Sequence, residues 1–126
     1  MIAMETVFAK DRAGWRRWLE KNLARSQEIW LVFYKKGTGE SGVSYGDAVE
    51  EALCFGWIDG MKKTLDEDRY AFRFTPRKPK SQWSKSNLER VERLIAHGRM
   101  MPTGLKAYEA SNRRSGKRSE SSASKS

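Results

Sequence analysis

The run IWLVFYKK at residues 29–36 constrains the fold more than any other stretch of the chain. Its six successive apolar side chains, most of them β-branched or aromatic, favour a strand. Successive side chains of a strand point to opposite faces, so both faces are apolar here: Ile29, Leu31 and Phe33 on one, Trp30, Val32 and Tyr34 on the other. We therefore expect an interior strand that is covered on both sides.

Helices are predicted where apolar side chains recur every three or four residues. This spacing occurs at about 11–24, 45–55, 86–97 and 102–110. Asp11 is a suitable N-cap for the first helix. Ser44 with Asp47 resembles a capping box at the second, and Ser86 with Glu89 matches that pattern at the third.

Residues 57–65 and 69–76 flank the polar tripeptide DED and predict a β-hairpin. In its second strand an aromatic face alternates with a more polar one: Tyr70, Phe72 and Phe74 against Ala71, Arg73 and Thr75. About three strands packed with about four helices predict a small single domain of the α+β class.

The 126 residues suffice for one domain and one core, which we place at residues 5–111. Residues 112–126 are serine-rich and basic. Such a segment cannot bury enough surface to offset the entropy of ordering it, so we expect a disordered tail.

The chain carries 25 cationic and 16 acidic residues, a net charge of +9, which favours anionic partners such as nucleic acid or a phosphorylated ligand. A single cysteine excludes an internal disulfide, and a single histidine removes most zinc sites and makes a histidine-based triad improbable. We expect no metal site and no cofactor.

No apolar run approaches the roughly 20 residues of a membrane span, and the start lacks a signal-peptide core, so a cytoplasmic protein is expected.

Two residues with reactive side chains have simple structural interpretations. Cys54 falls on the apolar face of a helix, where a free cysteine is usually a small core residue. His97 falls near the end of a helix, where a cation complements the helix dipole. Asp59 is less easily explained, because aspartate is disfavoured in a strand. It is a candidate general base or ligand anchor, although an ion pair with Arg73 on the neighbouring strand is the favoured interpretation.

The cations after the hairpin form the strongest candidate site. In a strand, Arg73, Thr75 and Arg77 share a face, and guanidinium groups suit phosphate or carboxylate recognition. A helix start follows within about 15 residues, and helix N-termini attract anions. A solvated basic surface is the alternative interpretation. Trp57 is expected in the core, whereas Trp83 could pack there or stack on a ligand. The candidate ligand-binding residues are Trp57, Asp59, Arg73, Thr75, Arg77, Trp83, Ser84 and Asn87.

Several stretches resemble the YdeI/OmpD-associated family, also called bacteriocin-protection proteins. They are WLVFYKK, SYGDAVEEALCFGWIDGMKKTLDEDRY, RFTPRKPKSQWSKSN and RVERLIAHGRMMPTGLKAYEA, in that order along residues 5–111. The resemblance implies a role in tolerance of bacteriocins or antimicrobial peptides and in stress responses. It implies no reaction, cofactor or catalytic residue. Longer relatives continue past the GRM segment with a further cation-rich stretch, whereas this chain continues with the serine-rich tail.

Three hypotheses follow from the sequence. The preferred one is a non-enzymatic domain that binds an anionic ligand or partner through Arg73 and Arg77. The second is a nucleic-acid-binding protein that uses the basic face of the hairpin and the tail. The third is an enzyme with Asp59 as its acid or base, and it is the weakest because Asp59 has no recognisable catalytic partner. The sequence does not determine the oligomeric state.

Overall fold

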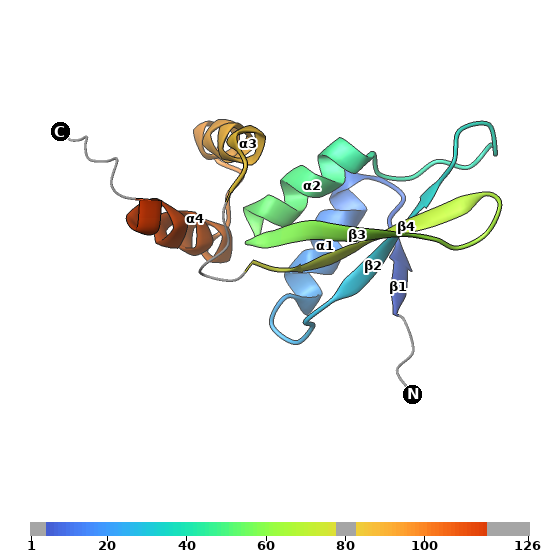
Figure 1. The fold of residues 1–126 in the computed structure, drawn as a ribbon, viewed down its shortest axis with the longest axis horizontal. Helices are drawn as coiled ribbons and strands as arrows, with labels where there is room; N and C mark the ends of the chain where they lie inside the picture. Colours follow the sequence, from blue (N-terminus) through green and yellow to red (C-terminus); the bar gives the residue numbers. More distant parts are fainter. Residues whose placement is uncertain (1–4, 78–82, 116–126) are drawn as a thin grey trace.

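The strand predicted at residues 29–36 is β2 (Ile29–Tyr34), and it lies inside a sheet with the strand order β1-β2-β4-β3 (Figure 1). The computed structural model describes residues 5–77 and 83–115. Ile29, Leu31 and Phe33 belong to the main core, and Trp30 and Val32 on the other face are 8% and 7% exposed. The expectation of an interior strand with two buried faces is therefore confirmed.

The elements that flank β2 follow the predicted α+β order closely. The remaining strands are β1 (Thr6–Phe8), β3 (Trp57–Thr64) and β4 (Arg69–Pro76). The helices are α1 (Arg12–Asn22), α2 (Tyr45–Cys54), α3 (Lys85–Ala96) and α4 (Pro102–Ser115). Strands β3 and β4 form the expected antiparallel hairpin, and β4 pairs antiparallel with β2.

Strand β1 is the element that the sequence analysis missed. It pairs in parallel with β2, with Thr6 opposite Trp30 and Phe8 opposite Val32. A three-residue edge strand has almost no periodicity of its own, and it exists because β2 offers it hydrogen-bonding partners. The sheet consequently has four strands within the described residues instead of about three.

Helices α1 and α2 cover one face of the sheet, while α3 and α4 lie beyond the end at which β3 begins (Figure 1). The covered face carries the aromatic side of β4, where Phe74 is fully buried and contacts the ring of Trp15. The indole of Trp15 also donates a hydrogen bond of 3.0 Å to the Ala48 carbonyl. Burial of such large side chains gives the core most of its stability.

The sequence predicted N-caps for three helices, and two of these predictions are confirmed. Asp11 caps α1 and Ser44 caps α2, as expected. The predicted capping box of Ser86 with Glu89 is wrong, because the N-cap of α3 is Ser84. Ser84 satisfies the same rule two residues earlier, so the helix begins at Lys85, ahead of the start that the box at Ser86 predicted.

Helix α4 continues to Ser115, past the boundary at residue 111 that the sequence analysis placed between domain and tail. The rest of the predicted tail, residues 116–126, lies outside the described residues.

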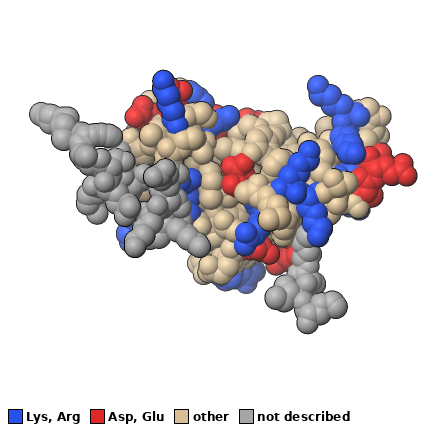
Figure 2. Space-filling model, in the orientation of Figure 1, with Lys and Arg blue, Asp and Glu red and all other residues tan. Residues whose placement is uncertain are grey.

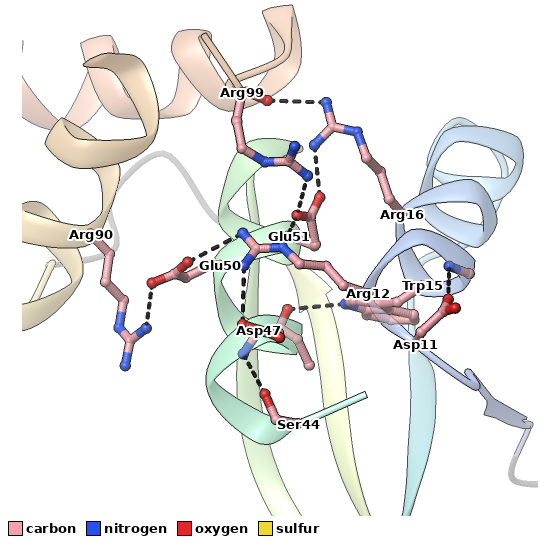
Figure 3. Close-up of polar contacts among 12 residues, drawn as sticks. Asp11, Arg12, Trp15, Arg16, Ser44, Asp47, Glu50, Glu51, Arg90 and Arg99 are labelled. Carbon is pink, nitrogen blue, oxygen red and sulfur yellow. Dashed lines mark hydrogen bonds and ion pairs between the residues drawn. The ribbon is translucent and has the colours of Figure 1, made fainter. Parts of the chain in front are cut away.

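Within the part of the chain that the structure describes, Glu51 is the one charged side chain in the buried interior, and three arginines surround it (Figure 3). Its Oε1 accepts a hydrogen bond of 2.7 Å from Arg16. Its Oε2 accepts bonds from Arg12 and from Arg99, the latter at 2.6 Å. These partners come from α1 and from the segment between α3 and α4, so one carboxylate ties two other parts of the chain to α2.

Glu50, the next residue of α2, makes a second such cluster. Its Oε1 accepts from Arg12 at 3.2 Å, and its Oε2 accepts from Arg90 at 2.9 Å and Arg93 at 2.8 Å. Arg12 also reaches Asp47 at 3.0 Å, so this one guanidinium bridges both glutamates and an aspartate of α2 (Figure 3). The two clusters orient α1 and α3 on α2 through charge as well as apolar packing.

Replacing Glu51 by Gln should lower the free energy of unfolding by about 3–5 kcal/mol, because it leaves partly buried guanidinium groups without their counter-charge. Chemical denaturation would measure the change. Glu20→Gln is the matched control, since Glu20 meets Arg16 at only 3.9 Å and is half exposed; it should cost at most about 1 kcal/mol. Equal losses in the two variants would contradict a special role for Glu51.

Acid should weaken the fold through these carboxylates. Burial raises the pKa of Glu51, but hydrogen bonds from Arg12, Arg99 and Arg16 lower it by more, and Glu50 behaves alike with Arg93 and Arg12. Both pKa values thus lie below the unfolded value of about 4.3. The stabilisation is present above that pH and is lost as the pH falls through the folded values. Urea denaturation between about pH 7 and pH 3 should show this decline, and Glu51→Gln should flatten it.

Candidate functional site

Arg73 and Arg77, the two cations expected to share a site, lie in different surroundings. Arg73 projects from the sheet face opposite the helices and donates a hydrogen bond of 2.6 Å to Glu28. Arg77 follows β4 and lies with its guanidinium 4.1 Å from the ring centre of Trp83. Arg73 and Arg77 are four positions apart along the chain, so their Cα atoms lie about 13 Å apart if the chain is extended. The backbone N–H of Arg77 still donates a hydrogen bond of 2.8 Å to Gly56, but the two side chains have different described partners, and the structure does not bring them together in one described site.

Asp59 does not pair with Arg73 either. It lies opposite Phe74 in the β3–β4 ladder, which places its side chain on the helix-covered face. There its carboxylate accepts a hydrogen bond from the hydroxyl of Tyr45, at the start of α2. Burial and this bond raise the pKa of Tyr45, so the phenol is held neutral. The favoured Asp59–Arg73 ion pair is therefore wrong, because the two residues are on opposite faces of the sheet.

Four other predicted residues lie in structural positions. The Ser84 hydroxyl accepts a hydrogen bond of 3.1 Å from the backbone N–H of Asn87, which is the N-terminal cap of α3. Thr75 is half-buried beside Ile58 of β3, on the face that carries Arg73. Trp57 is buried in the core, as expected, with its ring edge-on to Trp18.

Trp83 is the predicted residue whose role the sequence left open. Its ring centre lies 6.0 Å from that of Tyr108 on α4, and the guanidinium of Arg77 lies against it. The indole thus joins the end of the hairpin to α4 and holds Arg77 between them. Burial lowers the pKa of Arg77, and the field of Asp59 partly offsets this.

A cavity of about 320 Å³ opens next to Arg77, between the end of the hairpin and α4. We call it the α4 cavity. Most of its wall is apolar, with Arg77 and Lys106 as the cationic members. The lining residues among those described are Leu23, Phe55, Gly56, Trp57, Pro76, Arg77, Thr103, Lys106, Ala107 and Ala110.

Two glycines determine where the α4 cavity lies. Gly56 has φ +82°, and a Cβ there would come within 2.9 Å of the Thr103 carbonyl. A Cβ on Gly104 would lie 2.2 Å from the Cys54 carbonyl oxygen, closer than van der Waals contact permits. The same carbonyl accepts a hydrogen bond of 2.9 Å from the backbone of Met101. The start of α4 can therefore approach the end of α2 directly, which leaves the rest of α4 to form one wall of the cavity.

The sequence analysis identified Trp57 and Arg77 in this cavity but missed Lys106, Ala107 and Leu23. The available signals were the glycines Gly56 and Gly104, which the sequence analysis did not use. Small residues at two places far apart in the chain indicate close contact only once the fold is known.

Cys54 and His97, the remaining reactive residues, lie in the positions that the sequence analysis gave them. Cys54 is buried, and burial raises the pKa of its thiol, in agreement with the inert interpretation. His97 is the C-cap of α3. Within the described residues, no group of three or more His, Cys, Asp and Glu side chains could hold a metal ion. The described helices include none with the length and apolar character needed to cross a membrane.

The chain belongs to the family described as a domain of unknown function, DUF8412, whose model matches residues 7–107. The matched region runs from within β1 to the first part of α4 and includes every element between them. No curated protein and no solved structure matches the chain. The family match does not bear on the resemblance to the YdeI/OmpD-associated family, which stays a prediction.

Replacing Gly104 by Ala should force α4 away from α2 and destabilise the protein by about 1–3 kcal/mol, as overpacking does. Thermal unfolding would report the loss. Gly46→Ala is the matched control, because Gly46 is also helical and a Cβ there meets nothing within 4 Å; it should stabilise by about 0.5–1 kcal/mol. A Gly104→Ala protein as stable as the wild type would contradict the close approach.

Proposed function

We propose that this protein is a non-enzymatic binding domain whose ligand is a small molecule with an apolar body and one anionic group, held in the α4 cavity. The observation that carries the proposal is the combination of a mainly apolar wall with two cations, Arg77 and Lys106. Sites for small molecules usually have this composition, with few polar groups that fix the orientation. The cavity volume of about 320 Å³ suits a small ligand.

The position of Arg77 favours an anion over a neutral ligand. Its guanidinium lies against the ring of Trp83, and burial lowers its pKa. A lowered pKa means that the surroundings disfavour the charged form relative to water. A carboxylate or phosphate in the cavity would stabilise that charge, and Lys106 on α4 would add a second cation from the opposite wall.

Nucleic acid is less well supported as the partner. The cations of the hairpin have local partners: Arg69 pairs with Asp66 at 2.9 Å, and Arg73 pairs with Glu28. Lys62 lies over the ring of Tyr70. On the face seen in Figure 2, basic and acidic side chains are interspersed among uncharged ones instead of forming one basic surface. A protein that follows a phosphate backbone needs a continuous cationic track.

Catalysis by Asp59 is also less well supported than binding. Its carboxylate is engaged with Tyr45, whose raised pKa makes the phenol a poorer proton donor.

The resemblance to the YdeI/OmpD-associated family leads us to propose that ligand binding serves tolerance of bacteriocins or other stress.

Octanoate and 1-octanol test the proposal, because they share an alkyl chain and differ in charge. Isothermal titration calorimetry should show that octanoate binds at least about tenfold more tightly, as expected for a charge-assisted hydrogen bond. Lys106→Gln should remove most of that preference and leave octanol binding unchanged. Lys106 is exposed, so this variant should fold normally.

Arg73→Gln is the matched control, because it removes a cation of the predicted site that lies outside the α4 cavity. It should bind octanoate like the wild type. Equal affinity for octanoate and octanol, or the same loss in Arg73→Gln as in Lys106→Gln, would refute the proposed site.

A further inference from the structure

A second depression lies among the side chains of the glutamate–arginine clusters. It has a volume of about 380 Å³, and we call it the Arg93 groove. Residues from α1, α2, α3 and the segment after α3 line it: Arg12, Glu50, Arg93, Leu94, His97 and Arg99. It shares no lining residue with the α4 cavity among those described.

Each carboxylate of this region accepts three hydrogen bonds from the surrounding arginines. Glu51 accepts one bond at Oε1 and two at Oε2. Glu50 likewise accepts one at Oε1 and two at Oε2. All four oxygens thus accept at least one bond from an arginine, and several N–H groups of the same arginines make no bond to a glutamate among the described residues.

Arg93 and Arg99 have such groups at the groove. Each guanidinium carries five N–H donors. Within the described residues, Arg93 gives only Nη2 to Glu50, and Arg99 gives only Nη2 to Glu51. Their side chains remain 51% and 41% exposed, so the groove presents guanidinium groups that are held on one side and open to solvent on the other.

This arrangement differs from that of freely moving surface arginines. The bonds to the glutamates fix both guanidinium groups, which reduces the entropy lost when a ligand binds them. Arg12 donates a hydrogen bond from each of its three nitrogens to a carboxylate, so it contributes mainly its charge to the groove. The carboxylate of Glu50 also lines the groove, but it is 14% exposed and contacts three guanidinium groups, which limits its repulsion of an anion.

We propose that the Arg93 groove binds a phosphate group, either free or as the phosphoryl group of a small molecule, through Arg93 and Arg99 with His97 beside them. A tetrahedral oxyanion has several acceptor oxygens and can accept from two guanidinium groups at once. This site is independent of the proposed α4 cavity, so either can fail without the other.

Titration with inorganic phosphate at constant ionic strength tests the site on the full chain. Amide NMR should show shifts confined largely to residues 93–99, and calorimetry should give a saturable affinity. Arg93→Gln should weaken phosphate binding by about tenfold. It should fold, because Glu50 keeps Arg12 and Arg90 as partners. Arg17→Gln, which removes an exposed arginine of α1 outside the groove, should change the affinity by less than about twofold.

Further measurements distinguish the source of the phosphate and the competing interpretations. Glycerol 3-phosphate binding more tightly than phosphate would support the site with a phosphoryl ligand, and equal binding would support it with free phosphate. Lys106→Gln should leave both unchanged. No shift at residues 93–99, wild-type affinity in Arg93→Gln, or binding of an oligonucleotide where phosphate alone does not bind would each overturn the proposal.

Discussion

The rest of the structure depends on one buried carboxylate, that of Glu51. A charge in the interior is tolerated only where its hydrogen-bonding capacity is filled, and Arg12, Arg16 and Arg99 fill it from two other parts of the chain. Apolar packing of α1 on α2 would allow small changes of register. A carboxylate that needs several guanidinium groups at fixed distances allows far fewer, so the clusters specify how the helices meet.

Helix α2 consequently determines the position of both candidate sites. Its two glutamates fix the arginines of the Arg93 groove, and its C-terminal end receives α4 through Gly56 and Gly104. The same close approach forms the wall of the α4 cavity that carries Lys106. The clusters on one side of α2 and the glycine contact on its end therefore produce two separate cation-lined depressions.

The sequence predicted those features that depend on neighbours along the chain. The apolar run of β2, the hairpin and the caps at Asp11 and Ser44 follow from local periodicity and capping rules, and all of them are found. Features that depend on register were not predicted. Whether Asp59 meets Arg73 depends on which residue of β4 lies opposite it, and that residue is Phe74. Three-dimensional contacts also decide that Glu28 pairs with Arg73 and that Lys106 faces the hairpin.

The net charge of +9 is a poor guide to where this protein would bind an anion. Arg12 and Arg16 pair with the buried carboxylate of Glu51, and Arg73 pairs with Glu28 at the surface. A candidate anion site therefore needs a guanidinium that is held in place and whose charge a further anion would stabilise. Arg77 meets this condition because it is partly desolvated against Trp83, whereas Arg93 and Arg99 meet it because each gives one nitrogen to a glutamate and stays partly exposed. The physical basis differs between the two sites, and this is why they should discriminate between an amphipathic anion and a phosphate group.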